Sequence, residues 1–279
     1  MSQATQLFSG YQVPHLRLSG GPGWIRWVTL IALFGLWQAL SVYNQAHRLF
    51  NPVFLPSPTM VLQAASDLSR TGELQRHILA SGLRVLTGFG IGAALAVTLG
   101  VLVTRSKVFE NILEPILNLV GPIPPFAFLP MFIIWLGIGE TSKTTLIVYA
   151  TSLPILAYTI DGMRSVNPLL IRSALSLGAS EFDVFRRVIL KAALPNILVG
   201  MRISLALSFS ALVVAESVGA DAGLGYLIVD SRNYFKMPNM LLAAALIGIE
   251  YTIFERVLRL AERRLFRWRR GGLEHALER

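Results

Sequence analysis

The feature that most constrains this chain is a series of six long apolar runs. Each is close to the length of about 20 mostly apolar residues that a helix needs to cross the hydrocarbon core of a bilayer. Of the 279 residues, 53% are hydrophobic and only 15% are charged, and the mean hydropathy is +0.57. These values predict an all-α integral membrane protein with six transmembrane helices. The predicted spans are Trp27–Tyr43, Val85–Thr104, Pro115–Gly137, Thr144–Ile160, Ile197–Ala215 and Met237–Phe254.

The distribution of Lys and Arg predicts the orientation of these spans. Basic residues next to a span stay on the cytoplasmic side, and most of them lie near the two termini or between the fourth and fifth runs. Six spans put both termini on one side of the membrane. We therefore expect a cytoplasmic N-terminal segment (1–26), a six-span domain (27–254) with a cytoplasmic loop at 161–196, and a basic cytoplasmic tail (255–279).

Several kinds of chemistry are not indicated. The net charge of +9 would suit a nucleic-acid partner, but the basic residues accompany no aromatic base-stacking motif. The chain has no cysteine, and its four histidines are scattered rather than placed at a metal-ligand spacing. We expect no nucleic-acid partner, no metal site and no catalytic residue.

The loop between the fourth and fifth runs contains an amphipathic stretch, 169–188. Its apolar residues recur at helical spacing, and charged residues occupy the remaining positions. Gly178 suits a left-handed turn that closes a first helix, and Ser180 suits the cap of a second. Two short helices joined at a glycine could dock into a groove on another protein. The alternative is a surface loop held to anionic lipid headgroups by its arginines.

The third run contains the sequence GPIPPFAFLP, which begins at Gly121. Prolines remove backbone donors and break helices, so the freed carbonyls must be met by neighbouring helices or by a water-lined cavity. This indicates a pathway-lining or hinge region, or else a kinked span packed among its neighbours. Before it, Ser57 and Pro58 suit the start of a short amphipathic helix on the outer membrane surface.

Two acidic residues fall within or at the edge of the runs. A charge inside a membrane costs at least about 2.5 kcal/mol at the bilayer centre, so such residues are candidates for function. For Glu216, at the end of the fifth run, we expect a structural pairing with water or with a basic residue such as Arg232. For Glu250, in the sixth run, we expect a pairing with Arg202.

The stretch around Gly178 resembles the cytoplasmic signature loop of ATP-binding cassette (ABC) importer permeases. That signature reads Glu-Ala-Ala, three residues, Gly, nine residues, Ile, one residue, Leu-Pro. Arg172, Ser173 and Lys191 depart from it, whereas Ala174 and Gly178 match. The segments LPSP, GPIPPFAFLP, IIWLGIGETSK, LGAS, RRVILKAALPNILVGMRI and VVAESVGADAGLGYLI together resemble the permeases for nitrate, taurine and aliphatic sulfonates, over roughly Leu55 to Arg270.

This resemblance implies a type I ABC importer permease (MetI-like) fold in a bacterial inner membrane. It implies a homodimer, two cytoplasmic ATPase subunits, and a periplasmic or lipid-anchored substrate-binding protein, with membrane lipid around the spans. The chain has no G-x-x-x-x-G-K-[ST] loop, so ATP and Mg²⁺ would bind the partner ATPase and this chain would not be an enzyme. The residues expected to couple to the ATPase are Arg172, Ser173, Ala174, Leu177, Gly178, Ala179, Ser180, Glu181, Phe182, Asp183 and Phe185.

The substrate implied by the resemblance is a small oxyanion, with taurine or another sulfonate first and with nitrate, bicarbonate or another small nutrient as alternatives. A secondary transporter would need an inverted repeat and ion ligands deep in the spans, and the sequence shows neither. Backbone amides and hydroxyls should line an anion path. The candidates are Ile123, Pro124, Pro125, Thr151, Ser152, Ser208 and Ser210.

Overall fold

The structure is a computed structural model that describes residues 23–265. Within this range every regular element is a helix, which agrees with the all-α prediction. The predicted N-terminal segment and the basic tail lie largely outside the described residues. The chain divides into two compact units, residues 1–59 and 60–279, and each is described by itself.

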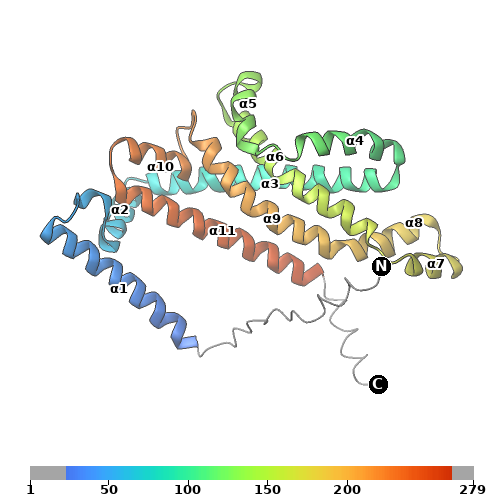
Figure 1. The fold of residues 1–279 in the computed structure, drawn as a ribbon, viewed down its shortest axis with the longest axis horizontal. Coiled ribbons are helices and arrows are strands. Elements are labelled where there is room, and N and C mark those ends of the chain that lie inside the picture. The colour runs from blue at the N-terminus through green and yellow to red at the C-terminus, as the bar shows by residue number, and fades with distance from the viewer. Residues whose placement is uncertain (1–22, 266–279) are drawn as a thin grey trace, which may run out of the picture. The chain divides into compact units, whose positions relative to one another are not determined.

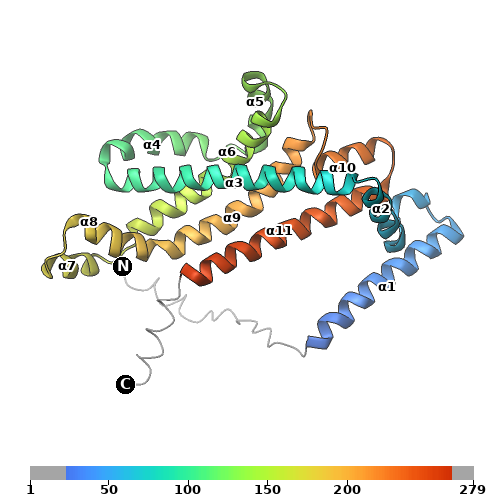
Figure 2. The same ribbon diagram turned by 180° about the vertical axis from the view of Figure 1, so that it is seen from behind.

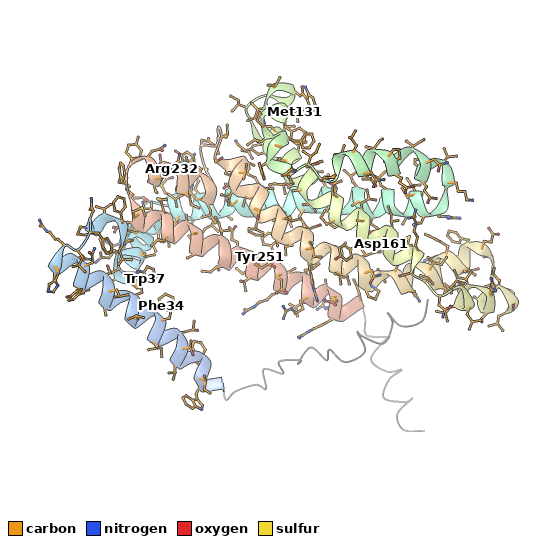
Figure 3. All side chains as sticks on the ribbon, in the orientation of Figure 1. Phe34, Trp37, Met131, Asp161, Arg232 and Tyr251 are labelled. Carbon is orange, nitrogen blue, oxygen red and sulfur yellow. The ribbon has the colours of Figure 1, made fainter. Side chains whose placement is uncertain are left out.

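The first unit contains the first predicted span. Helix α1 (Gly23–His47) encloses the run Trp27–Tyr43, and a single turn of 3₁₀ helix, η1 (Pro52–Phe54), follows it. The chain then folds back on α1, because Trp37 Nε1 donates to the carbonyl of Pro56 at 3.0 Å and Ser41 Oγ donates to that of Leu55 at 2.8 Å. Figure 3 labels Phe34 and Trp37 on α1.

The second unit is a bundle of long helices with short helices at its ends (Figures 1 and 2). Helix α2 begins at Pro58, as predicted. The elements are α2 (Pro58–Arg70), α3 (Glu73–Arg105), α4 (Lys107–Val120), η2 (Pro125–Phe128), α5 (Leu129–Leu136), α6 (Glu140–Arg164), α7 (Pro168–Ser176), α8 (Glu181–Val184), η3 (Phe185–Ile189), α9 (Leu190–Glu216), α10 (Leu224–Asn233) and α11 (Met237–Leu265).

The centre of the bundle is formed by α3, α6 and α9. One face of α3 carries glycines where α6 lies against it. A Cβ atom at Gly92 would lie 2.9 Å from the Cβ of Thr151, and one at Gly100 would lie 2.5 Å from the Cγ2 of Thr159. Small residues of this kind let two membrane helices approach closely. The buried apolar core between α6 and α9 includes Ile147, Leu205 and Leu212.

The third predicted span, Pro115–Gly137, is not one continuous helix. Helix α4 ends at Val120, and the pair formed by α4 and the η2–α5 segment is bent by 92°. The break falls on the predicted Gly and Pro cluster, where Pro122, Pro124 and Pro125 cannot donate backbone hydrogen bonds. The structure therefore shows a sharp break in this run rather than a kinked span.

Among the described residues, four helices are long and apolar enough to cross a membrane, or five if the bent pair counts as one span. These helices contain the first, second, fourth and fifth predicted runs, and the bent pair contains the third. The sixth run lies in α11 (Met237–Leu265), which is long enough but is interrupted by Glu250 and ends in charged turns. Helix α11 is therefore not among the helices that are apolar enough to cross a membrane.

Candidate functional site

The segment with the predicted docking residues forms a hairpin (residues 168–189) at one end of the bundle (Figure 1). Helix α7 ends at a turn in which Gly178 has a φ of 84°, a conformation that glycine adopts without steric cost. The Ala179 N–H donates to the carbonyl of Ala174 at 3.1 Å and closes the helix end. Ser180 Oγ accepts from the Asp183 N–H at 3.2 Å. The predicted turn and cap are confirmed.

The second half of the hairpin differs from the prediction of two separate short helices. Helix α8 continues through the π-helical turn η3 into α9, so that one helical stretch runs from Glu181 to Glu216. Neither a glycine nor another helix-ending residue stands between Glu181 and Pro195. The second helix of the hairpin is therefore the first part of the fifth span's own helix.

The tip of the hairpin carries exposed apolar side chains. Leu177 is 88% exposed and Phe182 is 59% exposed. An apolar knob on a polar hairpin has the shape of a docking surface, because it can fill a pocket on a partner. The coupling role stays a prediction. Of the other predicted coupling residues, Arg172, Ser173, Gly178, Ser180 and Glu181 are exposed, and Ala174, Ala179, Asp183 and Phe185 are half-buried.

A second polar group lies in the other half of the bundle and was missed in the sequence. Arg84, on α3, is 6% exposed. Its Nη1 donates to Glu216 at 2.7 Å, and its Nε and Nη2 donate to the two carboxylate oxygens of Glu140 at 2.7 and 2.6 Å. Lys143 Nζ lies 3.5 Å from Glu140 and donates to the carbonyl of Gly219 at 3.0 Å. We call Ser81, Arg84, Glu140, Lys143 and Glu216 the buried ion cluster; four of them are buried, and the side chain of Glu140 is 60% exposed.

The buried ion cluster also holds the turn that follows α9. Glu216 accepts hydrogen bonds from Ser81 Oγ at 2.8 Å and from the Gly225 N–H at 2.7 Å, and Arg84 donates to the carbonyl of Ala222 at 2.6 Å. A Cβ atom on Gly223 would lie 2.3 Å from the Glu216 carboxyl carbon. Buried charges of this kind need full pairing to offset their desolvation. The cluster therefore joins α3, α6, α9 and the start of α10.

The prediction that Glu216 pairs with a basic residue is confirmed, but the predicted partner, Arg232, is wrong. Arg232, labelled in Figure 3, is an exposed residue of α10, whereas Arg84 makes the ion pair. Arg84 directly precedes the predicted span Val85–Thr104, and no partner was predicted for it. The sequence did contain a signal for this pair. In a six-span chain, the start of the second span, at Arg84, and the end of the fifth, at Glu216, lie on the same side of the membrane.

The expected pairing of Glu250 with Arg202 is wrong. Arg202 forms its ion pair with Glu262, one of the polar residues in the last turns of α11. Both carboxylate oxygens of Glu250 lack a hydrogen-bond partner among the described residues, although the residue is only 7% exposed. Depth along a helix, which was the basis of the prediction, does not fix which face a side chain occupies.

The predicted pathway residues lie on α6, on α9 and in the broken segment, and their role stays a prediction. Ser208 and Ser210 donate to carbonyls of their own helix, those of Leu205 and Ala206, as Ser and Thr hydroxyls in membrane helices often do. Ser152 likewise donates to the carbonyl of Tyr149. The hydroxyl of Thr151 is buried without a hydrogen-bond partner among the described residues. Ile123 and Pro124 are exposed and Pro125 is half-buried in the broken segment.

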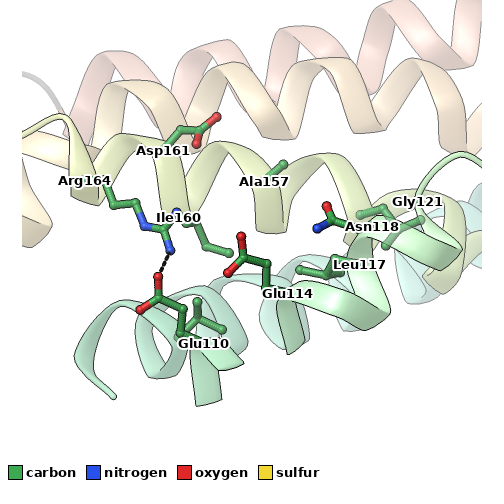
Figure 4. A pocket seen from close by; sticks show the side chains of 11 residues that line it. Glu110, Glu114, Leu117, Asn118, Gly121, Ala157, Ile160, Asp161 and Arg164 are labelled. Atoms are coloured by element: carbon green, nitrogen blue, oxygen red, sulfur yellow. Dashed lines mark hydrogen bonds and ion pairs between the residues drawn. The ribbon is translucent and has the colours of Figure 1, made fainter. Parts of the chain in front are cut away.

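A pocket of about 300 Å³ lies between α4 and α6 (Figure 4). Glu110, Glu114, Asp161 and Arg164 line it, and Arg164 Nη2 donates to Glu110 at 2.6 Å. Figure 4 shows the Glu114 and Asp161 carboxylates without a partner among the residues drawn. Three acids and one arginine leave the pocket negative, which disfavours an anionic ligand.

Comparison with known proteins identifies the family. Residues 88–267 match the model of the binding-protein-dependent transport system inner membrane component. The chain is 36% identical over 245 residues to the taurine transport system permease protein TauC of Escherichia coli, with 86% of this chain and 88% of TauC covered. It is 33% identical over 248 residues to the putative aliphatic sulfonates transport permease protein SsuC of Bacillus subtilis, with 88% of each chain covered.

Other relatives carry other names. The riboflavin transport system permease protein RibX of Chloroflexus aurantiacus is 35% identical over 245 residues, with 86% of this chain and 88% of RibX covered. A crystal structure of an amino acid ABC transporter with histidines has a similar fold, with a TM-score of 0.59 at 19% identity over 72% of this chain and 97% of the other. The chain belongs to the family of binding-protein-dependent transport system inner membrane components, the permease subunits of ABC importers.

Proposed function

We propose that this permease subunit forms the path for a small oxyanion, and that a sulfonate such as taurine is its substrate. The support is the similarity to a taurine permease and an aliphatic sulfonates permease, which extends over more than four fifths of the chain. Nitrate and bicarbonate are the alternatives of the same chemical class.

We further propose the assembly in which the subunit works. It acts as a homodimer in a bacterial inner membrane, with two ATPase subunits that bind ATP and Mg²⁺ and with a substrate-binding protein on the opposite side. Both termini and the hairpin face the ATPases. The observation that carries this proposal is the exposed apolar tip at Leu177 and Phe182, in the hairpin that connects α6 to α9. Both of these helices are long and apolar enough to cross a membrane.

The charged groups restrict where an anion can pass. The guanidinium of Arg84 donates to two carboxylates and a carbonyl. Lys143 Nζ donates to Glu140 and to the carbonyl of Gly219, so the buried ion cluster offers no free cation to a sulfonate. The pocket between α4 and α6 is negative. Donors for an anion are then expected from backbone amides elsewhere. The broken segment 121–125 does not supply them, because its three prolines have no N–H and the N–H groups of Gly121 and Ile123 donate to the carbonyls of Leu117 and Val120.

The experiment that tests this function is uptake into proteoliposomes that contain the subunit, its ATPase and the cognate binding protein. Labelled taurine, an alkanesulfonate and nitrate are compared with ATP inside the vesicles. We expect ATP-dependent uptake of the sulfonates, and none when the binding protein is omitted. Uptake of nitrate but of neither sulfonate would overturn the sulfonate proposal and would leave the oxyanion class intact.

A second candidate substrate is a neutral vitamin, because RibX is as similar in sequence identity as the sulfonate permeases are. The same vesicles test this with labelled riboflavin. Uptake of riboflavin but of none of the anions would overturn the oxyanion proposal and would leave the importer assignment intact.

A further inference from the structure

Helix α3 reaches from the buried ion cluster to the hairpin. Its 33 residues span roughly 50 Å at 1.5 Å per residue. Ser81 and Arg84, in its first half, hold Glu216. Its last residue, Arg105, lies at the hairpin, and its guanidinium carbon is 4.8 Å from the centre of the Phe185 ring. One helix thus contacts both polar regions of the bundle.

The Arg105 contact has the geometry of a cation–π interaction, in which a guanidinium lies within about 6 Å of a ring centre. The Phe185 ring is half-buried and packs, together with Ile189, against the core formed by Met163, Ala193 and Ile197. Phe185 therefore lies at the base of the hairpin, where its ring contacts α6 and α9, and the Arg105 guanidinium lies over the ring.

The backbone connection between the hairpin and α9 is irregular at the same point. Phe185 is the first residue of the π-helical turn η3, and π turns inside α-helices are frequent at functional sites. A pocket of about 370 Å³, lined among others by Thr104, Arg105 and Phe185, lies beside the ring. Without the arginine, the ring has room to move. The side-chain contact with α3 thus adds a second connection between the hairpin and the bundle, beside the helical stretch that runs from Glu181 into α9.

Helix α3 is in turn interlocked with α6. A Cβ atom on Gly88 would lie 2.6 Å from the Cγ2 of Ile147, and one on Gly100 would lie 2.5 Å from the Cγ2 of Thr159. Helices packed this closely do not slide past each other in small steps, because interiors are dense and side chains interdigitate. A displacement of the Arg105 end of α3 is therefore carried along the helix.

We propose that Arg105 is a positioning residue for transport, which through Phe185 makes the hairpin move as one body with α3. The hairpin would thereby transmit the motion of the ATPase to the helix that anchors the buried ion cluster. This inference rests on the proposed function of the hairpin, since it presumes that the ATPase docks there.

The test compares Arg105→Gln with Arg105→Lys and Phe185→Leu in the reconstituted complex with its ATPase and binding protein. For Arg105→Gln and Phe185→Leu we expect ATP hydrolysis to persist while substrate uptake per ATP falls roughly threefold or more, as for loss of one cation–π contact. Arg105→Lys keeps the cation and should restore part of the ratio. The double variant should be no worse than either single variant, because both remove the same contact. Lys107→Gln, which removes a charge two residues away, is the matched control.

A second measurement does not depend on the substrate. The natural chain has no cysteine, so cysteines at Leu79 on α3 and Arg186 in the hairpin accept two spin labels without other changes. With the ATPase bound, we expect the distance between the labels to stay constant on ATP binding in the natural sequence and to shift or broaden in Arg105→Gln.

The outcomes separate the two proposals. If the distances and the uptake ratios are the same in Arg105→Gln as in the natural sequence, the role of Arg105 is overturned. The role of Arg105 is also overturned if substrate uptake and ATP hydrolysis fall in parallel in Arg105→Gln. If the natural complex transports none of the tested substrates but the labels behave as expected, the substrate proposal fails and the role of Arg105 stands.

Discussion

The hairpin and the buried ion cluster use charge in opposite ways. In the hairpin, Arg172, Glu181 and Arg186 are exposed. The Asp183–Arg187 ion pair there is between half-buried and exposed side chains. In the buried ion cluster, Arg84 and Glu216 are almost completely enclosed and make several hydrogen bonds each.

The difference follows from what each region must bind. A buried carboxylate needs its hydrogen-bond partners inside the same chain, because no solvent replaces them. An exposed charge is hydrated and adds little to stability, generally less than about 1 kcal/mol per ion pair, so it is available to a partner protein. The buried ion cluster therefore serves the fold, whereas the charges of the hairpin are available for the proposed interface with the ATPase.

The largest expected effect is on the buried ion cluster. Arg84→Ala should lower the free energy of unfolding by about 3–5 kcal/mol, because it leaves Glu216 as an unpaired buried charge. Arg76→Ala removes a more exposed arginine that lies about two turns away on α3 and pairs with Glu73. It should cost less than about 1 kcal/mol. Thermal unfolding of the detergent-purified variants measures both. Equal losses would contradict the distinction between the two arginines.

Two glycines with positive φ provide the next comparison. Gly178→Ala, in the hairpin, meets no atom within 4 Å and should cost only the roughly 1–2 kcal/mol of a left-handed non-glycine residue. Gly223 has a φ of 132°, and the methyl group of Gly223→Ala would lie against the Glu216 carboxylate. Gly223→Ala should therefore destabilise the fold by more than Gly178→Ala does. The same unfolding measurement ranks the two. A larger loss for Gly178→Ala would mean that the hairpin turn is as tightly packed as the cluster.

A smaller effect is expected at the cap of α8. Ser180→Ala removes the side chain that accepts from the Asp183 N–H and should cost about 1 kcal/mol of local helix stability. Hydrogen exchange at residues 181–184 should speed up, whereas exchange around Glu216 should not change. Faster exchange in both regions would show that the hairpin contributes to the stability of the whole bundle.

Local features of the fold could be predicted from the sequence where one residue type determines the geometry. Gly178, Ser180 and Pro58 gave the turn, the cap and the helix start at the observed positions. The apolar runs located the long helices because burial in lipid needs a length of chain rather than a particular partner.

The missed ion pairs depend on contacts between distant segments. The Arg84 contacts with Glu140 and Glu216 join residues 56 and 132 positions apart, and the end of α11 supplies Glu262 to Arg202. Charge, spacing and depth show that a buried acid needs a partner, but the rotation of each helix decides which residue reaches it. The continuation of α8 into α9 is a local feature, and the sequence did carry a signal for it, because neither a glycine nor another helix-ending residue stands between Glu181 and Pro195.

The most direct test of the account is whether the hairpin, and not another exposed turn, binds the ATPase. Leu177→Ser removes the most exposed apolar side chain of the hairpin, and Phe235→Ser removes a 68% exposed side chain from the turn between α10 and α11. Affinity for the purified ATPase subunit is measured for both, alongside thermal unfolding. We predict binding weakened roughly tenfold or more by Leu177→Ser, as for a central interface residue, with unchanged unfolding and with normal binding for Phe235→Ser. Unchanged affinity in Leu177→Ser, or equal loss in the two variants, would contradict the docking role of the hairpin.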